Sequence, residues 1–215
     1  MPAASLAEVL SRSRVEGYLG PGSIDVHVDH GRAHLGAADP RPGSNWLDLG
    51  SGGGLPGLVM AAERPDLHLT LLDRSQKRTD FLRRAVRELE LTQVEVVTSD
   101  ASDFAREAAH RATFDGVVSR SFGAPALVAE VSCALLRTGG RLVVSEPPQD
   151  QGGSAEPGVR WPRDALHLVG FGDLAIRGNN PSFAILTLTT LPPADRPRRW
   201  AQMVKRPLFG PDEVD

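Results

Sequence analysis

A glycine-rich stretch that follows an apolar run constrains the fold of this chain more than any other feature. Residues 46–57 read Trp-Leu-Asp-Leu-Gly-Ser-Gly-Gly-Gly-Leu-Pro-Gly, and a helix-like apolar pattern comes next. This order predicts a strand, a tight loop and a helix, which together open a nucleotide-binding α/β domain. Gly50 and Gly52 can adopt backbone angles closed to other residues, so the loop can turn tightly against a ligand. A plain strand-to-helix turn is the alternative interpretation.

Bulk properties exclude several classes of protein. The formal net charge is -3, so no global basic field indicates nucleic acid, although a local basic patch is compatible with it. Cys133 is the only cysteine, which excludes a disulfide framework and a cysteine metal cluster, and we expect it in the core. No run approaches the ~18 apolar residues of a membrane span, and no signal peptide is evident. We therefore expect a cytoplasmic protein without membrane contact.

The rest of the chain alternates between strand and helix patterns. After a helix at 3–18, we expect strands at 46–49, 67–73, 94–98, 114–120 and 141–145, helices at 75–91 and 124–136, and a final strand pair at 166–177 and 182–191. Such an order predicts a three-layer, doubly wound α/β domain. We expect one domain over 1–195 with an N-terminal helical segment at 1–40. The basic, then acidic tail at 196–215 is expected to be an appendage.

Three histidines lie close together near the N-terminus. His27, His30 and His34 are interspersed with Asp25 and Asp29, which raises the question of a metal site. No second ligand cluster supports that interpretation, so we favour solvated loop histidines or residues that face a partner, and we expect no metal.

Polar residues at the ends of three strands are candidates for ligand binding, because ligands in such sheets bind at the carboxyl ends of the strands. Asp73 ends the second strand about 20 residues past the glycine loop, where a carboxylate can bind both ribose hydroxyls of an adenosine. Its alternative role is to cap the next helix. The polar turn at 99–104 lies where an adenine ring would bind, although Ser102 or Asp103 can instead cap a helix. Arg120 lies in a turn at the mouth of the sheet.

Five motifs together point to a known family. The stretches 48–57, 70–73 and 114–122, with Lys77-Arg78 and Phe81-Leu82, closely resemble the ribosomal small-subunit guanine-N7 methyltransferases, also called glucose-inhibited division protein B. The resemblance implies a class I methyltransferase fold: a Rossmann-like three-layer sandwich with a mostly parallel seven-stranded sheet and a C-terminal antiparallel strand pair. It implies S-adenosylmethionine as cofactor and 16S rRNA, or the small ribosomal subunit, as partner. The implied cofactor-binding residues are Asp48, Gly50, Ser51, Gly52, Leu55, Asp73, Arg74, Asp100, Ala101, Ser102 and Arg120.

The resemblance also assigns roles by position. Gly50 and Leu55 flank the methionine part of the cofactor, while Ala101 and Ser102 border its adenine. Asp48 orients the glycine loop and the cofactor's ammonium group. Arg120 lies at the junction of cofactor and substrate as the catalytic candidate.

The chemistry agrees with a site that has no evident base. Guanine N7 carries a free lone pair, so positioning supplies most of the acceleration. Arg120 can hydrogen-bond the guanine O6 edge, or it can instead form a salt bridge with a neighbouring acid.

The sequence is compatible with two other functions. Ser145-Glu146 stands where the family has lysine-glycine, and residues 1–40 lack the family's tryptophan-asparagine stretch. A methyltransferase of the same fold with a small-molecule or protein acceptor is one alternative, and a non-catalytic cofactor-binding partner is the other. The rRNA hypothesis predicts a basic rim from Arg78, Arg83, Arg84 and the tail arginines. The oligomeric state is left open.

Overall fold

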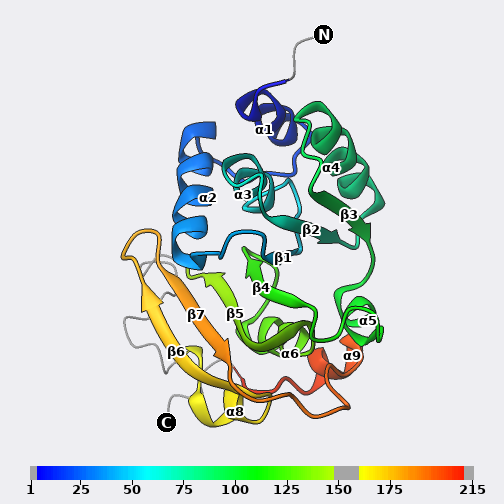
Figure 1. Ribbon diagram of the computed structural model, residues 1–215, viewed down its shortest axis with the longest axis vertical. Coiled ribbons are helices and arrows are strands. Elements are labelled where there is room, and N and C mark those ends of the chain that lie inside the picture. Colours follow the sequence, from blue (N-terminus) through cyan, green and yellow to red (C-terminus); the bar gives the residue numbers. More distant parts are fainter. Residues whose placement is uncertain (1–3, 148–159, 211–215) are drawn as a thin grey trace.

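The computed structural model describes residues 4–147 and 160–210, and it contains a seven-stranded sheet in the order β3-β2-β1-β4-β5-β7-β6 (Figure 1). All neighbouring strands are parallel except β7, which runs antiparallel to both β5 and β6. The predicted class I methyltransferase fold is therefore confirmed. The strands are β1 (Asn45–Leu49), β2 (His68–Asp73), β3 (Val94–Thr98), β4 (Phe114–Ser119), β5 (Leu136–Ser145), β6 (Phe171–Arg177) and β7 (Phe183–Leu188).

Helices cover both faces of this sheet. One layer contains α1 (Leu6–Val15), α2 (Ile24–Ala38), α3 (Gly57–Glu63) and α4 (Gln76–Glu88). The other contains α5 (Ala101–Arg106), α6 (Pro125–Leu135), α8 (Arg163–His167) and α9 (Trp200–Lys205). Figure 1 shows the first four helices above the sheet and the others below it. No helix in the described ranges is long and apolar enough to cross a membrane.

Strand alternation explains the two layers. On β1, Trp46 packs into the cluster beneath α2 and α3, whereas Leu47 and Leu49 pack into the cluster beneath α5 and α6. Successive side chains of a strand point to opposite faces, so a strand that is buried on both sides has a continuous apolar sequence. Cys133 is fully buried in the second cluster, as expected.

Helix α2 corrects the expectation of loop histidines. The buried positions of this helix include His27, Gly31 and His34, with two alanines in its last turn. Their spacing is helical, but histidine, glycine and alanine give no apolar periodicity to detect. Gly31 lets the helix approach α3 closely, since a Cβ there would lie 2.8 Å from Val59. A second correction is α8, a short helix that occupies the first residues of the strand expected at 166–177.

The segment after Leu191 packs against the domain, which differs from the appendage expected from its composition. Glu130 on α6 is fully buried, and its carboxylate accepts hydrogen bonds from the backbone N–H of Arg198 at 3.1 Å and from its Nε at 2.7 Å. Arg196 approaches the same carboxylate at 3.7 Å, and Met203 of α9 is fully buried. These contacts hold α9 beside α5 and α6 (Figure 1).

The Arg198–Glu130 pair generates a stability prediction. We expect Arg198→Met to lower the free energy of unfolding by about 3 kcal/mol, because it leaves a buried carboxylate without its main partner. The double variant Arg198→Met/Glu130→Met should cost much less, since no buried charge remains. Urea denaturation of both variants and of Glu130→Met alone measures this coupling. The prediction is contradicted if the double variant loses as much free energy of unfolding as the two single variants together.

Candidate active site

The glycine loop after β1 folds back onto the end of β2. The backbone N–H groups of Gly50 and Ser51 both donate to the carbonyl of Leu72, each at 2.9 Å. Gly50 has a φ of +74° and Gly52 a φ of +52°, so both adopt the left-handed region that favours glycine. A Cβ on Gly50 would also lie 2.4 Å from the ring of Phe122. The loop is therefore shaped by backbone angles and by close packing that its glycines alone permit.

Asp48 lies beneath this loop and is fully buried. One carboxylate oxygen, Oδ2, accepts a hydrogen bond from the backbone N–H of Gly57 at 3.0 Å, which ties the end of β1 to the start of α3. The other oxygen, Oδ1, has no hydrogen-bond partner within the described part of the chain. Burial raises the pKa of Asp48 to about 7, and the Gly57 hydrogen bond opposes that rise.

Asp73 ends β2 and is nearly buried. Its Oδ2 accepts a hydrogen bond from the backbone N–H of Gly52, and its Oδ1 accepts one from Ser75, each at 2.9 Å. Arg78 approaches the same carboxylate at 3.6 Å. The residue at the N-cap of α4 is Ser75, so the alternative prediction that Asp73 caps this helix is wrong.

The polar turn after β3 is organised by Asp100. This residue is the N-cap of α5, and its Oδ1 accepts hydrogen bonds from the backbone N–H groups of Ser102 and Asp103 and from the Ser102 hydroxyl. Neither Ser102 nor Asp103 is the cap, which corrects that alternative. Ser102 is buried, and its hydroxyl oxygen accepts a hydrogen bond from the backbone N–H of Trp200 at 3.2 Å.

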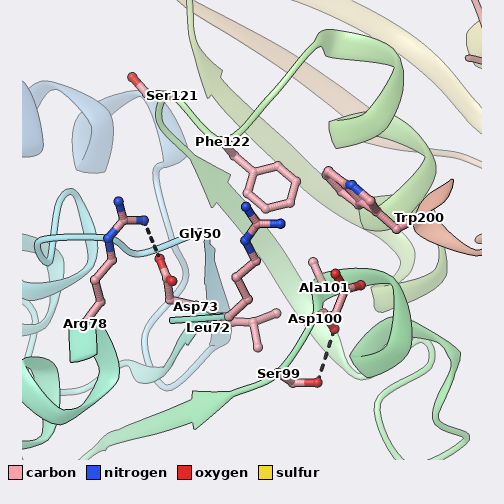
Figure 2. A pocket seen from close by; sticks show the side chains of 11 residues that line it. Gly50, Leu72, Asp73, Arg78, Ser99, Asp100, Ala101, Ser121, Phe122 and Trp200 are labelled. Atoms are coloured by element: carbon pink, nitrogen blue, oxygen red, sulfur yellow. Dashed lines mark hydrogen bonds and ion pairs between the residues drawn. The ribbon is translucent and has the colours of Figure 1, made fainter. Parts of the chain in front are cut away.

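A cavity opens among the ends of β1, β2, β3 and β4 (Figure 2). It brings together five of the predicted residues, Gly50, Asp73, Arg74, Asp100 and Ala101. It also exposes two aromatic side chains that sequence reasoning did not include, Phe122 and Trp200. Phe122 is the last residue of the 114–122 motif used for the resemblance, although it was not assigned to the site, and nothing in the local sequence places Trp200 here. We call this space the nucleoside cavity.

A second cavity adjoins the first at Gly50, Arg78 and Ser121. Besides Gly50, four predicted residues line it, namely Ser51, Gly52, Leu55 and Arg120. The opposite wall is formed by the segment between α1 and α2, at Tyr18, Leu19 and Gly20, and by His27. We call it the loop cavity. Asp48 and Ser102 line neither cavity and support the walls from beneath.

Arg120 lies between the loop cavity and a third, larger cavity of about 590 Å³. Its Nη1 is buried without a hydrogen-bond partner among residues 4–147 and 160–210, and its Nη2 lies 3.5 Å from Nδ1 of His27. No acid in these ranges forms a salt bridge with it, so that alternative is wrong for the described structure. Arg120 therefore lines both cavities without an acidic partner in the described ranges.

The third cavity, which we call the acceptor cavity, is walled by the ends of β4 and β5, by α2 and by the turn between β6 and β7. Glu146, which stands where the family usually has glycine, lies in this wall and is hydrogen-bonded to two neighbouring side chains. Its carboxylate accepts hydrogen bonds from Nη1 of Arg160 and Nε1 of the buried Trp161, each at 2.9 Å. Arg160 also lines the acceptor cavity, so the wall offers a guanidinium as well as a carboxylate.

Two of the three histidines of α2 are buried rather than solvated, and His30 is half-buried. His27 and His34 are nearly or fully inaccessible, and Nε2 of His34 lies 3.0 Å from the Val143 carbonyl. Burial lowers the pKa of His34 to about 3 and that of His30 to about 4, so both are neutral at pH 7. The described residues contain no group of three or more potential metal ligands.

The predicted basic rim is only partly present. Arg83 pairs with Asp80 and Arg84 with Glu16, while the tail residues Arg196 and Arg198 bind Glu130. Of the predicted rim, Arg78 lines the nucleoside and loop cavities, and the other guanidinium groups that line cavities are those of Arg74, Arg120 and Arg160.

The family model and the curated relatives that match this chain carry the same family name. The model of the family described as "rRNA small subunit methyltransferase G" matches residues 36–150. A ribosomal RNA small subunit methyltransferase G from Rubrobacter xylanophilus is 34% identical over 180 residues, which are 79% of this chain and 67% of that protein. The protein of the same name from Deinococcus radiodurans is 36% identical over 170 residues, or 76% of this chain and 65% of its own length.

Solved structures show the same fold at low sequence identity. An S-adenosylmethionine-dependent O-methyltransferase from Thermotoga maritima superposes with a TM-score of 0.63 at 11% identity, covering 85% of this chain and 71% of the other. A precorrin-6y C5,15-methyltransferase from Geobacter metallireducens gives 0.54 at 15% identity, covering 75% and 88%.

The burial of Asp48 generates a prediction for the ligand-free protein. Its pKa is raised from 3.8 to about 7, so between pH 4 and 7 the folded state binds more protons than the unfolded state. The free energy of unfolding therefore falls as pH rises, by up to about 1.4 kcal/mol per pH unit. Asn cannot ionise, so Asp48→Asn should gain stability relative to wild type over this range. Urea denaturation from pH 4 to 8 measures it, and a constant difference between the two proteins would refute it.

Proposed function

The chain belongs to the rRNA small subunit methyltransferase G family, and on that premise we propose that it transfers a methyl group from S-adenosylmethionine to N7 of a guanine in 16S rRNA. One observation carries the geometric part of this proposal. Arg120 and Ser121 line both the loop cavity and the acceptor cavity, so a cofactor in the first meets a base in the second at these residues. We propose that the protein acts on this RNA within the small ribosomal subunit.

The nucleoside and loop cavities fit this cofactor. Asp73 is fixed by two backbone N–H groups, and each of its oxygens retains a lone pair for a ribose hydroxyl. Asp100 and Ala101 lie where the adenine would bind, beside Arg74. Asp48 has an unpartnered buried oxygen directly beneath the loop, which favours a positive group there.

These residues divide the cofactor between the two cavities. Gly50 separates them, with Ser51, Gly52 and Leu55 along the proposed methionine portion. Ser102 acts indirectly, because its hydroxyl joins Asp100 to Trp200.

Little proton chemistry is required of the protein. The cofactor supplies a methyl group that is already activated by its positively charged sulfur. Guanine N7 has a free lone pair, so the protein has only to hold this nitrogen in line with the methyl group and exclude water. Arg120 is the proposed catalytic residue, since a guanidinium can donate to guanine O6 from a position beside N7. Arg120 lines the acceptor cavity, and no acid among the described residues forms a salt bridge with its guanidinium.

The acceptor cavity has the chemistry of a nucleotide site. Arg120 and Arg160 lie in its wall, together with Asn179 and Asn180 of the β6–β7 turn. Arginine suits phosphate as well as base edges, and amide side chains can contact either. We therefore infer that the target guanine and its flanking phosphates enter from this side.

The central test is methyl transfer to rRNA. With methyl-labelled S-adenosylmethionine and small ribosomal subunits that lack their guanine-N7 mark, wild-type protein should label 16S rRNA. Asp73→Ala should bind S-adenosylhomocysteine at least tenfold more weakly by calorimetry, because charged hydrogen bonds to the ribose contribute about 1.5–3 kcal/mol. The exposed Asp103→Ala is the matched control and should behave as wild type. Cofactor binding without labelled rRNA would reject the proposed acceptor.

Substitution of Arg120 tests the proposed contact with the guanine separately from the binding of the cofactor. We expect Arg120→Met to lower kcat/KM for the ribosomal substrate by about 100-fold, through loss of a guanine contact of 1–3 kcal/mol together with poorer alignment. Its Kd for S-adenosylhomocysteine should change less than threefold. Arg120→Lys keeps the charge without the planar fork, and its activity should fall between the two. An equal loss of cofactor and substrate affinity would place Arg120 in the cofactor site alone.

A further inference from the structure

The C-terminal segment brings an aromatic residue into the nucleoside cavity. Helix α9 begins at Trp200, whose indole ring lies beside Phe122 in the wall of the cavity in Figure 2. The two rings meet edge to face, with centroids 5.7 Å apart and an interplanar angle of 77°. Backbone contact is direct as well, since the N–H of Trp200 donates to the hydroxyl of Ser102. Trp200 is therefore part of the wall of this cavity.

Buried contacts on both sides hold Trp200 in this position. Arg198 forms its multiple hydrogen bonds with Glu130 two residues earlier, and Met203 is fully buried three residues later. The ring also packs against the core cluster that contains Ala101. A ligand loses less free energy in ordering a wall that is already fixed, so such a residue suits binding.

The cavity has an apolar part and an acidic part. Phe122, Trp200 and Ala101 provide apolar and aromatic surface, whereas Asp73 and Asp100 provide carboxylates beside it. A nucleoside has the same division, with a flat base that stacks on aromatic rings and a sugar that donates hydrogen bonds. Aromatic contact with a base contributes about 1–3 kcal/mol when measured by removal of the aromatic side chain.

We propose that Trp200 binds the adenine of the cofactor, so that the segment 196–206 contributes a binding residue to the cofactor site. This inference rests on the proposed function, because it takes an adenosine-containing cofactor as the ligand. It adds a binding residue from the end of the chain, where the motifs that define the family do not extend. Glu130 and Arg198 are then positioning residues, which act by holding Trp200 at the cavity.

Calorimetry with S-adenosylhomocysteine tests the contact directly. Trp200→Leu keeps an apolar side chain against Phe122 but removes the aromatic face, and we expect its Kd to rise about tenfold. Trp200→Phe should stay within about threefold of wild type. Val204→Ala changes an exposed residue of the same helix and should leave Kd unchanged. The probe 5′-methylthioadenosine, which lacks the amino-acid part, should lose the same factor in Trp200→Leu.

Tryptophan emission gives a second readout that does not depend on activity. The other two tryptophans, Trp46 and Trp161, are buried and line neither the nucleoside nor the loop cavity. Titration with S-adenosylhomocysteine should change the emission of wild type, and Trp200→Phe should lose most of that change. Thermal unfolding of each variant shows whether the fold is retained.

The outcomes separate this inference from the proposed function. If wild type and Trp200→Leu bind S-adenosylhomocysteine equally well, Trp200 is not an adenine contact, and the cofactor assignment stands. If Val204→Ala weakens binding as much as Trp200→Leu does, the effect belongs to the helix as a whole and the direct contact is rejected. If wild type does not bind the probe, the cofactor assignment and this inference both fail.

Discussion

The hydrogen bond between the Asp48 carboxylate and the Gly57 N–H is the contact on which the site depends. It joins the C-terminal end of strand β1 to the first residue of helix α3, so it fixes both ends of the loop between them. Gly57 has to be glycine, because a Cβ there would lie 2.6 Å from the carboxylate oxygen. The second oxygen of this carboxylate has no hydrogen-bond partner among the described residues, and burial raises the pKa of Asp48. A local cost of this kind is typical of residues kept for function rather than stability.

Much of the fold and about half of the site follow from the sequence because their signals are local. A strand, a glycine loop and a helix lie within a few residues of one another, and an acid after β2 or an arginine after β4 reaches the same edge once the sheet is parallel. Asp73 and Arg120 could therefore be predicted. Helix α2 was missed because its buried face consists of His27, Gly31, His34 and alanines, which carry no apolar period. Trp200 was missed because only tertiary packing brings it to the cavity.

The tail shows how charge counted along a sequence differs from charge on a surface. Its arginines suggest an RNA-binding extension, yet Arg196 and Arg198 surround the buried carboxylate of Glu130. A buried acid inside an apolar helix such as α6 requires a cation, and the tail supplies it. The ion pair therefore serves to attach α9, and these two arginines are not free to bind phosphate.

Arg120 differs from these tail arginines because no acid within residues 4–147 and 160–210 forms a salt bridge with it. Arg120 is partly buried, and burial lowers its pKa while Asp48 opposes that change. A guanidinium shielded from water interacts more strongly with a ligand acceptor than an exposed one does, because the local dielectric is lower. One such group at the junction of two cavities can thus contribute more to base recognition than several surface arginines. A net charge of -3 is therefore compatible with RNA as a substrate when a guanidinium such as that of Arg120 lies where the target base is proposed to enter.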